Sequence, residues 1–386
     1  MNILFLLRYY PSFGGGESVT LRLAKGFINR GHKVYVMYLW DENKTSPGDI
    51  DEGIISRKVK GIHSPLSRNR IRLFDNIPMG IQLSKLINAE KIDIVINQWW
   101  PNRLANKSKG NAILVKCQHT MVKAKIGKRK YIIRLAGEHA YNIIQQYYWR
   151  HYYKTILEKS DYYVVLSKSM IEDLRDILKD MYERYEGRIE IISNPNRYKA
   201  LENIGKKERL CIYVGRFSEE KRINLLVEAW KRNEKIIKDN NWRLILVGDG
   251  PLKEKINNMI IELDCCNIES VGFVDPYTYY ERASFCLLTS SVEGFPMTLI
   301  EGMSKGCIPI VMNTFSTCSD LISDGKDGFL TENTIESFSD ILCHCIQMDS
   351  NALEKNMLRC VTKSKEFELE AIIDKWESFM SRICKL

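Results

Sequence analysis

Residues 285–312 read FCLLTSSVEGFPMTLIEGMSKGCIPIVM, and this stretch contains four segments of different character. An apolar run is followed by a polar, glycine-containing loop, then by a helical pattern that proline opens and glycine closes, and then by a second apolar run. The segments are Phe285–Thr289, Ser290–Phe295, Met297–Lys305 after Pro296, and Ile308–Met312 after Gly306. A strand, helix and strand in this order predict two parallel strands of one sheet.

The same alternation recurs along the chain and starts afresh after Asn194–Pro195–Asn196, which we interpret as a linker. We therefore expect an α/β fold with two Rossmann-like, doubly wound parallel-sheet domains facing a central cleft. The predicted domains are residues 1–195 and 196–366, with a terminal helical segment at 367–386. Further predicted strands are Asn2–Leu7, Lys33–Leu39, Ile92–Asn97, Ile113–Lys116, Tyr162–Leu166, Leu210–Val214 and Leu244–Val247, and predicted helices are Glu17–Asn29 and those starting at Ile223 and Pro251.

Length and composition agree with a two-domain globular protein. The chain has 386 residues, 45% of them hydrophobic and 27% charged. No apolar run of about 18 residues occurs, and the first residues resemble a strand rather than a signal peptide. The 11 cysteines are scattered without a C-x-x-C pair, which favours free thiols in a reducing, cytoplasmic compartment. Cys343, His344 and Cys345 lie in an apolar helical stretch without a partner pair, so we expect no metal there.

Positive charge is concentrated in the first half. Residues 1–195 hold 32 Lys and Arg against 19 Asp and Glu, whereas the remainder holds 25 against 29. The interval from Arg103 to Arg134 contains no acidic residue, which predicts attraction to an anionic surface or acceptor.

Two carboxylates flank the start of the helix in the opening stretch. Glu293 lies in the loop, and Glu301 lies about one and a half turns inside the helix and interrupts its apolar run. Carboxylates at such positions suit recognition of vicinal hydroxyls. The alternative is a solvent-facing helix glutamate and a loop glutamate that the helix dipole stabilises.

Two cations occupy another predicted loop between a strand and a helix. Arg216 and Lys221, in VGRFSEEK, are placed to flank a diphosphate, although an ordinary exposed loop also fits the pattern. Gly248–Asp249–Gly250–Pro251 is a weaker phosphate-loop signal. Asp49–Ile50–Asp51 has the D-x-D form of a metal motif, but we interpret this acidic loop as solvated.

Five motifs in order resemble those of glycosyltransferase family 4 over nearly the whole chain. They are GGGESVTL with the later LA and RGHKV, VGRFSEEK, LVGDGP, VGFV and SSVEGFPMTLIEGMSKG. The resemblance implies a GT-B fold and metal-independent transfer, without a cofactor, that retains the anomeric configuration. It further implies that 1–195 binds the acceptor, that 196–366 binds a nucleotide sugar, and that 367–386 crosses back to the first domain. Asn194–Pro195–Asn196 departs from the Asn-Gly that is usual in the family's inter-domain loop.

The resemblance also implies roles for particular residues. Arg216 and Lys221 resemble the ligands of the donor diphosphate, Glu293 the contact to the donor sugar, and Glu301 the ligand of the ribose. His119 matches by position a histidine near the donor sugar, and a structural role is an equal alternative for it. The remaining expected donor contacts are Gly15, Gly16, Gly272, Phe273, Gly294, Phe295, Pro296 and Met297.

The expected reaction moves a hexose or N-acetylhexosamine from a UDP-sugar to a lipid-linked glycan in surface-polysaccharide assembly. A soluble acceptor and a non-catalytic nucleotide-sugar-binding subunit are the alternatives. Lys123–Arg134 and the aromatic, apparently helical segment Tyr131–Ser160 suggest a peripheral contact with an anionic inner membrane face. A packed face between helices with a solvated basic rim fits that segment equally well. No nucleic-acid-binding module is recognised.

Overall fold

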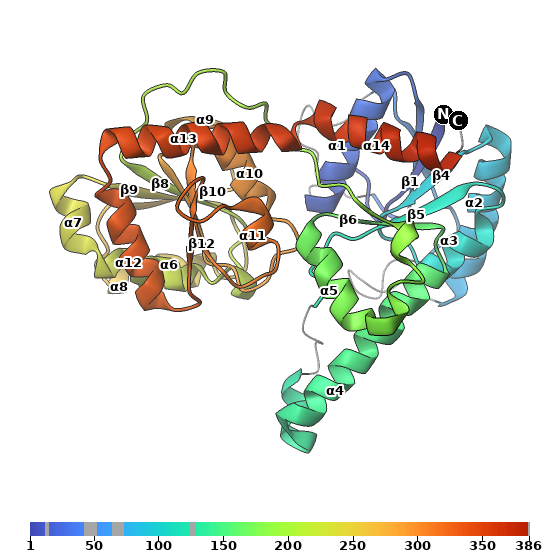
Figure 1. Cartoon of the computed structure of the whole chain (residues 1–386), viewed down its shortest axis with the longest axis horizontal. Helices are drawn as coiled ribbons and strands as arrows, with labels where there is room; N and C mark the ends of the chain where they lie inside the picture. The colour runs from blue at the N-terminus through green and yellow to red at the C-terminus, as the bar shows by residue number, and fades with distance from the viewer. Residues whose placement is uncertain (12–14, 42–51, 64–72, 124–128, 385–386) are drawn as a thin grey trace. The chain divides into compact units, whose positions relative to one another are not determined.

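The computed structural model describes residues 1–11, 15–41, 52–63, 73–123 and 129–384. The chain forms two compact units, of which unit 1 comprises Met1–Pro195 with Leu369–Leu386 and unit 2 comprises Asn196–Glu368 (Figure 1). Each unit has one parallel sheet with helices on both faces, so the expected doubly wound α/β class is confirmed.

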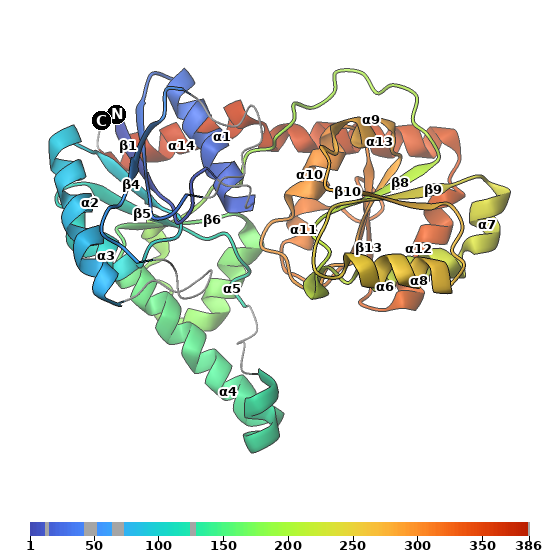
Figure 2. The same cartoon turned by 180° about the vertical axis from the view of Figure 1, so that it is seen from behind.

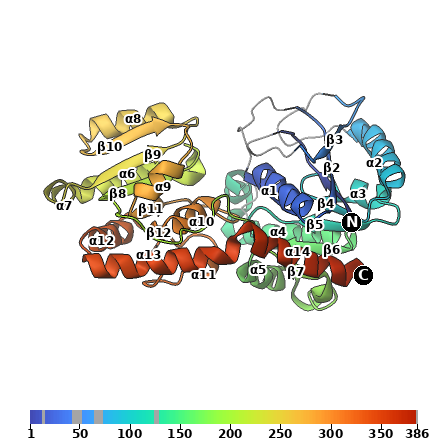
Figure 3. The same cartoon turned by 90° about the horizontal axis from the view of Figure 1, so that it is seen from above.

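The sheet of unit 1 has the order β3-β2-β1-β4-β5-β6-β7 within the described residues, and the strands labelled in Figure 3 follow this order from β3 to β7. All pairs are parallel, and the order reverses between β1 and β4. The strands are β1 Asn2–Leu6, β2 Lys33–Tyr38, β3 Ile55–Lys58, β4 Ile94–Asn97, β5 Ile113–Cys117, β6 Tyr162–Val165 and β7 Ile189–Ile191. Because β1 and β4 are apolar throughout their centre, both faces of this sheet have to be covered by helices.

Right-handed crossovers distribute the helices of unit 1 between the two faces. The connection from β1 to β2 runs in one direction along the sheet, whereas those from β3 onward run in the other, so α1 covers one face and α2 to α5 the opposite face. Figures 1 and 2 show this separation, with α4 extending beyond the sheet. The bounds are α1 Gly15–Asn29, η1 Leu73–Asp75, α2 Asn76–Glu90, α3 Asn102–Ser108, α4 Arg129–Glu158, α5 Lys168–Leu178, η2 Lys179–Met181, η3 Glu186–Arg188 and α14 Leu369–Cys384.

Helix α14 returns to unit 1 after the chain has completed unit 2, and it packs on α1. The rings of Phe27 and Trp376 meet edge to face at 6.2 Å. Gly26 allows the two helices to approach, since a Cβ there would lie 2.5 Å from the Cγ1 of Ile373. Arg30 adds an exposed ion pair to Asp374 at 2.7 Å. Unit 1 is therefore built from two separate parts of the sequence.

Helix α4 differs from the sequence-based expectation in one respect. A long helix was expected over Tyr131–Ser160, and α4 spans Arg129–Glu158 but contains a non-helical residue, Gly137, at φ 81°. Glycine adopts this conformation without the clash that a Cβ causes. Among the described residues, no helix is long and apolar enough to cross a membrane.

The sheet of unit 2 has the order β10-β9-β8-β11-β12-β13, which reverses between β8 and β11 (Figure 3). Its strands are β8 Leu210–Val214, β9 Arg243–Val247, β10 Ile268–Gly272, β11 Phe285–Leu288, β12 Ile308–Met312 and β13 Phe329–Thr331. Its helices are η4 Glu219–Lys221, α6 Ile223–Arg232, α7 Glu234–Asp239, α8 Lys253–Glu262, α9 Tyr277–Arg282, α10 Met297–Ser304, α11 Cys318–Leu321, α12 Ile335–Ile346, α13 Ser350–Ser364 and η5 Lys365–Phe367. The strands and helix expected within residues 285–312 are present to within one residue at each end.

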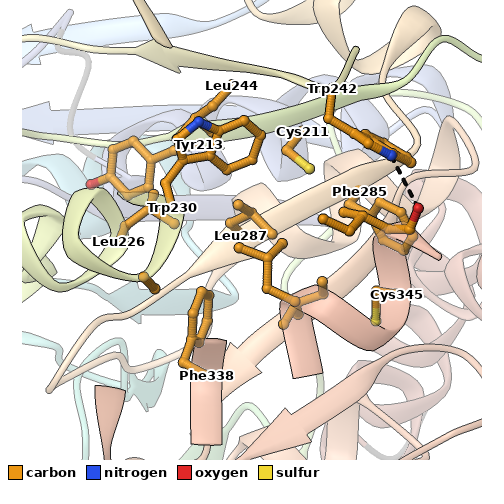
Figure 4. Packing of buried hydrophobic residues seen from close by; sticks show 14 of the residues in the cluster. Cys211, Tyr213, Leu226, Trp230, Trp242, Leu244, Phe285, Leu287, Phe338 and Cys345 are labelled. Atoms are coloured by element: carbon orange, nitrogen blue, oxygen red, sulfur yellow. Dashed lines mark hydrogen bonds between the residues drawn. The ribbon is translucent and has the colours of Figure 1, made fainter. Parts of the chain in front are cut away.

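The core of unit 2 lies between its sheet and helices α6, α8 and α12. Trp230 of α6 is fully buried, and Trp242 meets Phe285 of β11 with ring centroids 5.5 Å apart (Figure 4). The indole Nε1 of Trp242 donates to the carbonyl oxygen of Ile346 at 3.0 Å, so this buried polar group is satisfied. Cys211 and Cys345 lie in the same cluster, where burial raises the pKa of both thiols.

Backbone segments interlock at the carboxyl ends of β8 and β9. A Cβ on Gly248, whose φ is +144°, would lie 1.9 Å from the carbonyl oxygen of Gly215. A Cβ on Gly250 would lie 2.4 Å from the carbonyl oxygen of Phe217. The amide of Phe217 donates to the carbonyl oxygen of Asp249 at 2.9 Å. The two glycines of LVGDGP are thus required for this loop to pack against VGRFSEEK.

We predict that Gly248→Ala lowers the free energy of unfolding by about 1–3 kcal/mol, because it adds a clash with backbone and a strained φ. Urea denaturation checks this, with Gly205→Ala as the matched control, since a Cβ on Gly205 meets nothing within 4 Å. Equal stability of the two variants would contradict the prediction.

Candidate functional site

Two loops meet in unit 2 where the strand order reverses. One follows β8 and carries Lys221, and the other follows β11 and carries Glu293. The Nζ of Lys221 donates to Oε1 of Glu293 at 2.5 Å, and the two side chains are 21% and 12% exposed. Ligands of open α/β sheets bind outside the carboxyl ends of the strands at this reversal. The ion pair therefore occupies the expected ligand position of unit 2.

The two loops are also joined through their backbones. The amide of Ser291 donates to the carbonyl oxygen of Glu220 at 2.7 Å. The hydroxyl of Thr289 donates to the carbonyl oxygen of Lys221 at 3.0 Å. These bonds fix the backbone on both sides of Lys221 relative to the strand that leads to Glu293.

Arg222 links the same two loops through hydrogen bonds from its guanidinium. Its backbone lies in the left-handed region, at φ 48° and ψ 44°, between η4 and α6. Its guanidinium donates from Nε to the carbonyl oxygen of Thr289 at 2.7 Å and from Nη2 to that of Ser290 at 3.3 Å. Nη1 donates to Oδ1 of Asn333 at 2.7 Å. A non-glycine residue in this conformation costs about 1–2 kcal/mol, which the charge-assisted hydrogen bonds offset.

Arg216, on the same loop as Lys221, is exposed. Burial alone would raise the pKa of Glu220, but a hydrogen bond from Ser218 and the charges of Lys221 and Arg216 outweigh it and lower that pKa. Both predicted diphosphate cations thus lie near one carboxylate. The arrangement gives two positive charges at the carboxyl end of β8, in a loop that the backbone bonds hold in place.

Helix α10 starts directly after the Glu293 loop. Gly294 and Met297 are partly buried, Pro296 precedes the first helical residue, and Phe295 is buried with its ring 5.8 Å from that of Phe367. Glu301 lies about one turn after Met297 on α10, near Tyr198 and Tyr280. Burial is the main cause that raises the pKa of both tyrosines, and the negative charge of Glu301 is the second.

Strand β10 ends at Gly272, whose φ is +78° and whose carbonyl oxygen accepts from the amide of Gly248 at 2.8 Å. The next residue, Phe273, is 73% exposed. An exposed aromatic ring beside a fixed loop is suited to stacking on a planar ligand. The carboxyl ends of β8, β10 and β11 therefore carry, on one edge of one sheet, the predicted donor residues of unit 2.

Unit 1 brings together a second set of predicted residues at the reversal between β1 and β4. Gly15 and Gly16 begin α1, and a Cβ on Gly16 would lie 2.8 Å from the ring of Trp99, which follows β4. The imidazole of His119, after β5, stacks on Trp99 with centroids 5.5 Å apart. Gln98 Oε1 is hydrogen-bonded to His119 Nε2, so Nε2 carries the hydrogen.

Burial and the nearby charge of Lys116 lower the pKa of His119 to about 3, so its imidazole is neutral near pH 7. Burial also lowers the pKa of Lys116 to about 8, and Lys116 Nζ donates to the carbonyl oxygen of Gln98 at 2.7 Å. Within the described residues, His119 Nδ1 has no hydrogen-bond partner. A cavity of about 10 Å³ borders His119 and Gln98, which is room for roughly one water.

Other predicted features have mixed outcomes. Lys123 forms ion pairs with Asp173 and Asp176 of α5, at 3.0 and 2.8 Å, so it is engaged within unit 1. The remaining cations of Lys123–Arg134 have side chains outside the described residues, as has all of Asp49–Ile50–Asp51. No group of metal-ligating residues occurs in the described part of the chain, which includes Cys343, His344 and Cys345.

Family comparisons match both units. The model described as glycosyltransferase family 4 matches residues 13–195, and that described as glycosyl transferases group 1 matches residues 196–357. Together they account for nearly all of the sequence between the first strand and α13. The chain is a GT-B glycosyltransferase of family 4. The family resemblance of the sequence is thereby confirmed, and the protein is an enzyme.

Relatives of named activity differ in their acceptors. A Campylobacter jejuni N-acetylgalactosaminyltransferase that acts on a diphospho-undecaprenol-linked sugar is 31% identical over 180 residues, which is 45% of this chain and 47% of that protein. The N-acetyl-α-D-glucosaminyl L-malate synthase of Bacillus anthracis is 22% identical over 98% of this chain and 96% of its own. The pneumococcal O-GlcNAc transferase GtfA, solved with UDP and GlcNAc, has a TM-score of 0.75 at 13% identity, covering 99% of both chains.

In this glycosyltransferase, Arg222 is the residue of the unit 2 site that sequence reasoning missed. It directly follows Lys221, but its sequence context gives no sign of a left-handed backbone or of carbonyl partners on a distant loop. We predict that Arg222→Ala speeds amide exchange at Ser291 by about tenfold or more, because the loop after β11 loses its charge-assisted bonds.

Hydrogen exchange with mass spectrometry measures this effect. Arg232→Ala is the matched control, since Arg232 at the end of α6 makes an exposed pair with Glu336 of α12 in the same unit. Unchanged exchange over residues 289–293 in Arg222→Ala would show that Arg222 does not hold the loop.

We also predict that the His119 imidazole stays neutral on acidification to pH 5. Its pKa in the folded enzyme lies below the ordinary value of about 6.5, so protons bind the unfolded chain more readily. Stability linked to His119 is therefore complete above about pH 6.5 and declines as the pH falls toward 3. NMR titration of the imidazole, assigned with His119→Gln, checks this, and a midpoint near 6.5 would contradict it.

Proposed function

We propose that this enzyme transfers a hexose or N-acetylhexosamine, with retention, from a UDP-sugar to a lipid-linked glycan in surface-polysaccharide assembly. The observation that carries the proposal is the Lys221–Glu293 pair at the strand reversal of unit 2, with Arg216 on the same loop. Cations and a carboxylate side by side match a donor that has a diphosphate next to a polyhydroxylated ring.

The donor roles follow the chemistry of each side chain. Arg216 and Lys221 bind the diphosphate, Glu293 accepts hydrogen bonds from the sugar hydroxyls, and Glu301 binds the ribose. Gly272 and Phe273 lie beside the base, and Gly294 to Met297 surround the sugar and phosphates near the start of α10. Such a site favours an anion through its helix terminus as well as its side chains.

Without donor, Lys221 and Glu293 satisfy each other. In the proposed complex, the diphosphate takes over Lys221, and Glu293 is released to the sugar hydroxyls. Exchange of partners keeps both charges compensated throughout, so neither is left unpaired in a partly buried site.

Bond breaking places negative charge on the departing diphosphate. We propose that Arg216 and Lys221 stabilise it without a metal, because their charges are fixed near the leaving oxygen before reaction. The acceptor hydroxyl attacks on the face from which the diphosphate leaves, and its proton passes to a leaving phosphate oxygen. His119, with Gly15 and Gly16, is the proposed contribution of unit 1, as a neutral imidazole.

The acceptor assignment rests on the C. jejuni relative, whose name specifies an undecaprenol-linked acceptor, and on the basic charge of the first half of the chain. The UDP assignment rests on the ligand named for the pneumococcal structure. A soluble acceptor is the second candidate, favoured by the match to the malate-specific synthase over nearly the whole of both chains. We propose a peripheral position at the inner membrane face for the lipid-linked case.

We predict that UDP and UDP-sugars raise the Tm, whereas GDP and ADP do so less, and that Glu301→Ala weakens the UDP effect.

Lys221→Ala should lower the turnover of the active UDP-sugar by about 10²–10³-fold, corresponding to lost stabilisation of the leaving group. The product anomer, read by NMR, tests retention.

Glu254→Ala, an exposed change on α8, is the matched control for Glu301→Ala. If no nucleotide at millimolar concentration shifts the Tm, the donor assignment fails. If UDP-sugar is turned over with L-malate or another soluble hydroxyl but not with lipid-linked glycans, the soluble acceptor replaces the lipid-linked one.

A further inference from the structure

Large apolar side chains are exposed on two helices of unit 1. The first group comprises Phe74 of η1 and Ile77 and Ile81 of α2, which are 79%, 66% and 52% exposed. The spacing of Ile77 and Ile81 places them on one side of α2, opposite the buried Met79, Leu83 and Ile87. Only the inner side of α2 is therefore used by the core.

The second group lies on α4. Ile143, Ile144, Tyr147 and Tyr148 are exposed and follow the i, i+1, i+4, i+5 spacing of one helix face. Tyr153, Ile156 and Leu157 are buried on the opposite face, and Tyr153 donates from its hydroxyl to the carbonyl oxygen of Val122 at 2.9 Å. The inner face thus fixes α4 to the unit, and the outer face presents isoleucine and tyrosine.

Helix α3 places positive charge between these groups. The helices α2, α3 and α4 cover the same face of the sheet, since they connect strands in the same direction (Figure 2). On α3, Arg103 and Lys107 are exposed, whereas Ala105 and Ser108 are buried. Among residues whose side chains the structure describes, the three helices hold five Lys and Arg against three Glu. This outer layer therefore combines apolar side chains with net positive charge.

We infer that this outer layer of η1, α2, α3 and α4 docks on an anionic lipid surface. Isoleucine and phenylalanine side chains enter the interface, tyrosine rings lie at headgroup depth, and Arg103 and Lys107 bind lipid phosphates. A second copy of the chain fits less well, because two such layers carry charge of the same sign and repel each other. The inference rests on the proposed function, to which it adds the face that meets the membrane.

The layer also has a defined relation to the reaction site of its own unit. Helices α2 and α4 follow strands β3 and β5, so their first halves lie at the carboxyl edge of the sheet. Trp99 and His119 are at that edge too, after β4 and β5. Docking through this layer would keep the carboxyl edge of unit 1 near the lipid surface, where a lipid-linked acceptor is presented.

The test is flotation of the full chain with vesicles of phosphatidylglycerol and phosphatidylethanolamine, compared with phosphatidylcholine alone. Binding to the anionic vesicles is expected at low salt and is expected to fall at 0.5 M salt, because screening weakens it. Ile77→Ser/Ile81→Ser and Ile143→Ser/Tyr147→Ser should each lower binding by about tenfold or more, and Arg103→Gln/Lys107→Gln should abolish the preference for anionic lipid.

The matched control is Ile261→Ser/Leu358→Ser, which removes exposed apolar side chains that are 75% and 51% exposed in unit 2. The Tm and its shift with UDP should be the same in every variant, which separates docking from folding and from the donor site. Donor turnover without vesicle binding would overturn the docking face and leave the proposed reaction intact. Vesicle binding without donor turnover would overturn the proposed reaction and leave the docking face intact. An equal loss in the control, or a dimer that the α2 and α4 variants convert to monomer, would also overturn the inference.

Discussion

The site of unit 2 depends on how closely two backbone segments approach at the ends of β8 and β9. Gly248 and Gly250 admit the carbonyl oxygens of Gly215 and Phe217 at distances that no side chain permits. This contact fixes the start of the loop that carries Arg216 and Lys221, and bonds from Ser291 and Thr289 fix its end. These contacts hold the backbone of the loop that carries the cations, and the pair with Glu293 holds the side chain of Lys221 in addition. Preorganised charge of this kind needs no rearrangement when negative charge develops on a leaving group.

The two units share a reversal of strand order but place different side chains at it. In each, the strand order reverses beside the first strand, and the functional candidates lie in the loops at that reversal. Unit 2 places the Lys221–Glu293 pair there, whereas unit 1 places glycine, tryptophan and a neutral histidine beside the cations Lys116 and Arg8. The fold supplies the positions, and the loop residues supply the specificity.

Much of this arrangement was predictable because it is encoded locally. The strands and helix of residues 285–312 follow from hydrophobic periodicity, proline and glycine, and the loops that carry Arg216 and Glu293 follow from the strand ends. Their proximity follows from strand order, which local pattern does not give. The role of Arg222 depends on carbonyl groups about 67 residues away in sequence. On α4, Tyr, Trp and Ile occur all around the helix, so composition did not separate the buried Tyr141 and Tyr153 from the exposed Tyr147 and Tyr148.

The position of α14 makes unit 2 an insertion within unit 1. The ribosome releases residues 1–195 long before Trp376 and Ile373. Helix α1 therefore lacks α14 while the whole of unit 2 is synthesised. During that time Phe27 and the surface beside Gly26 lack the helix that covers them. Unit 2 can complete its core first, since its segment is continuous in sequence. A fragment that ends at Pro195 would consequently expose apolar surface, so a stable isolated unit 1 needs α14 rejoined to it through a short linker.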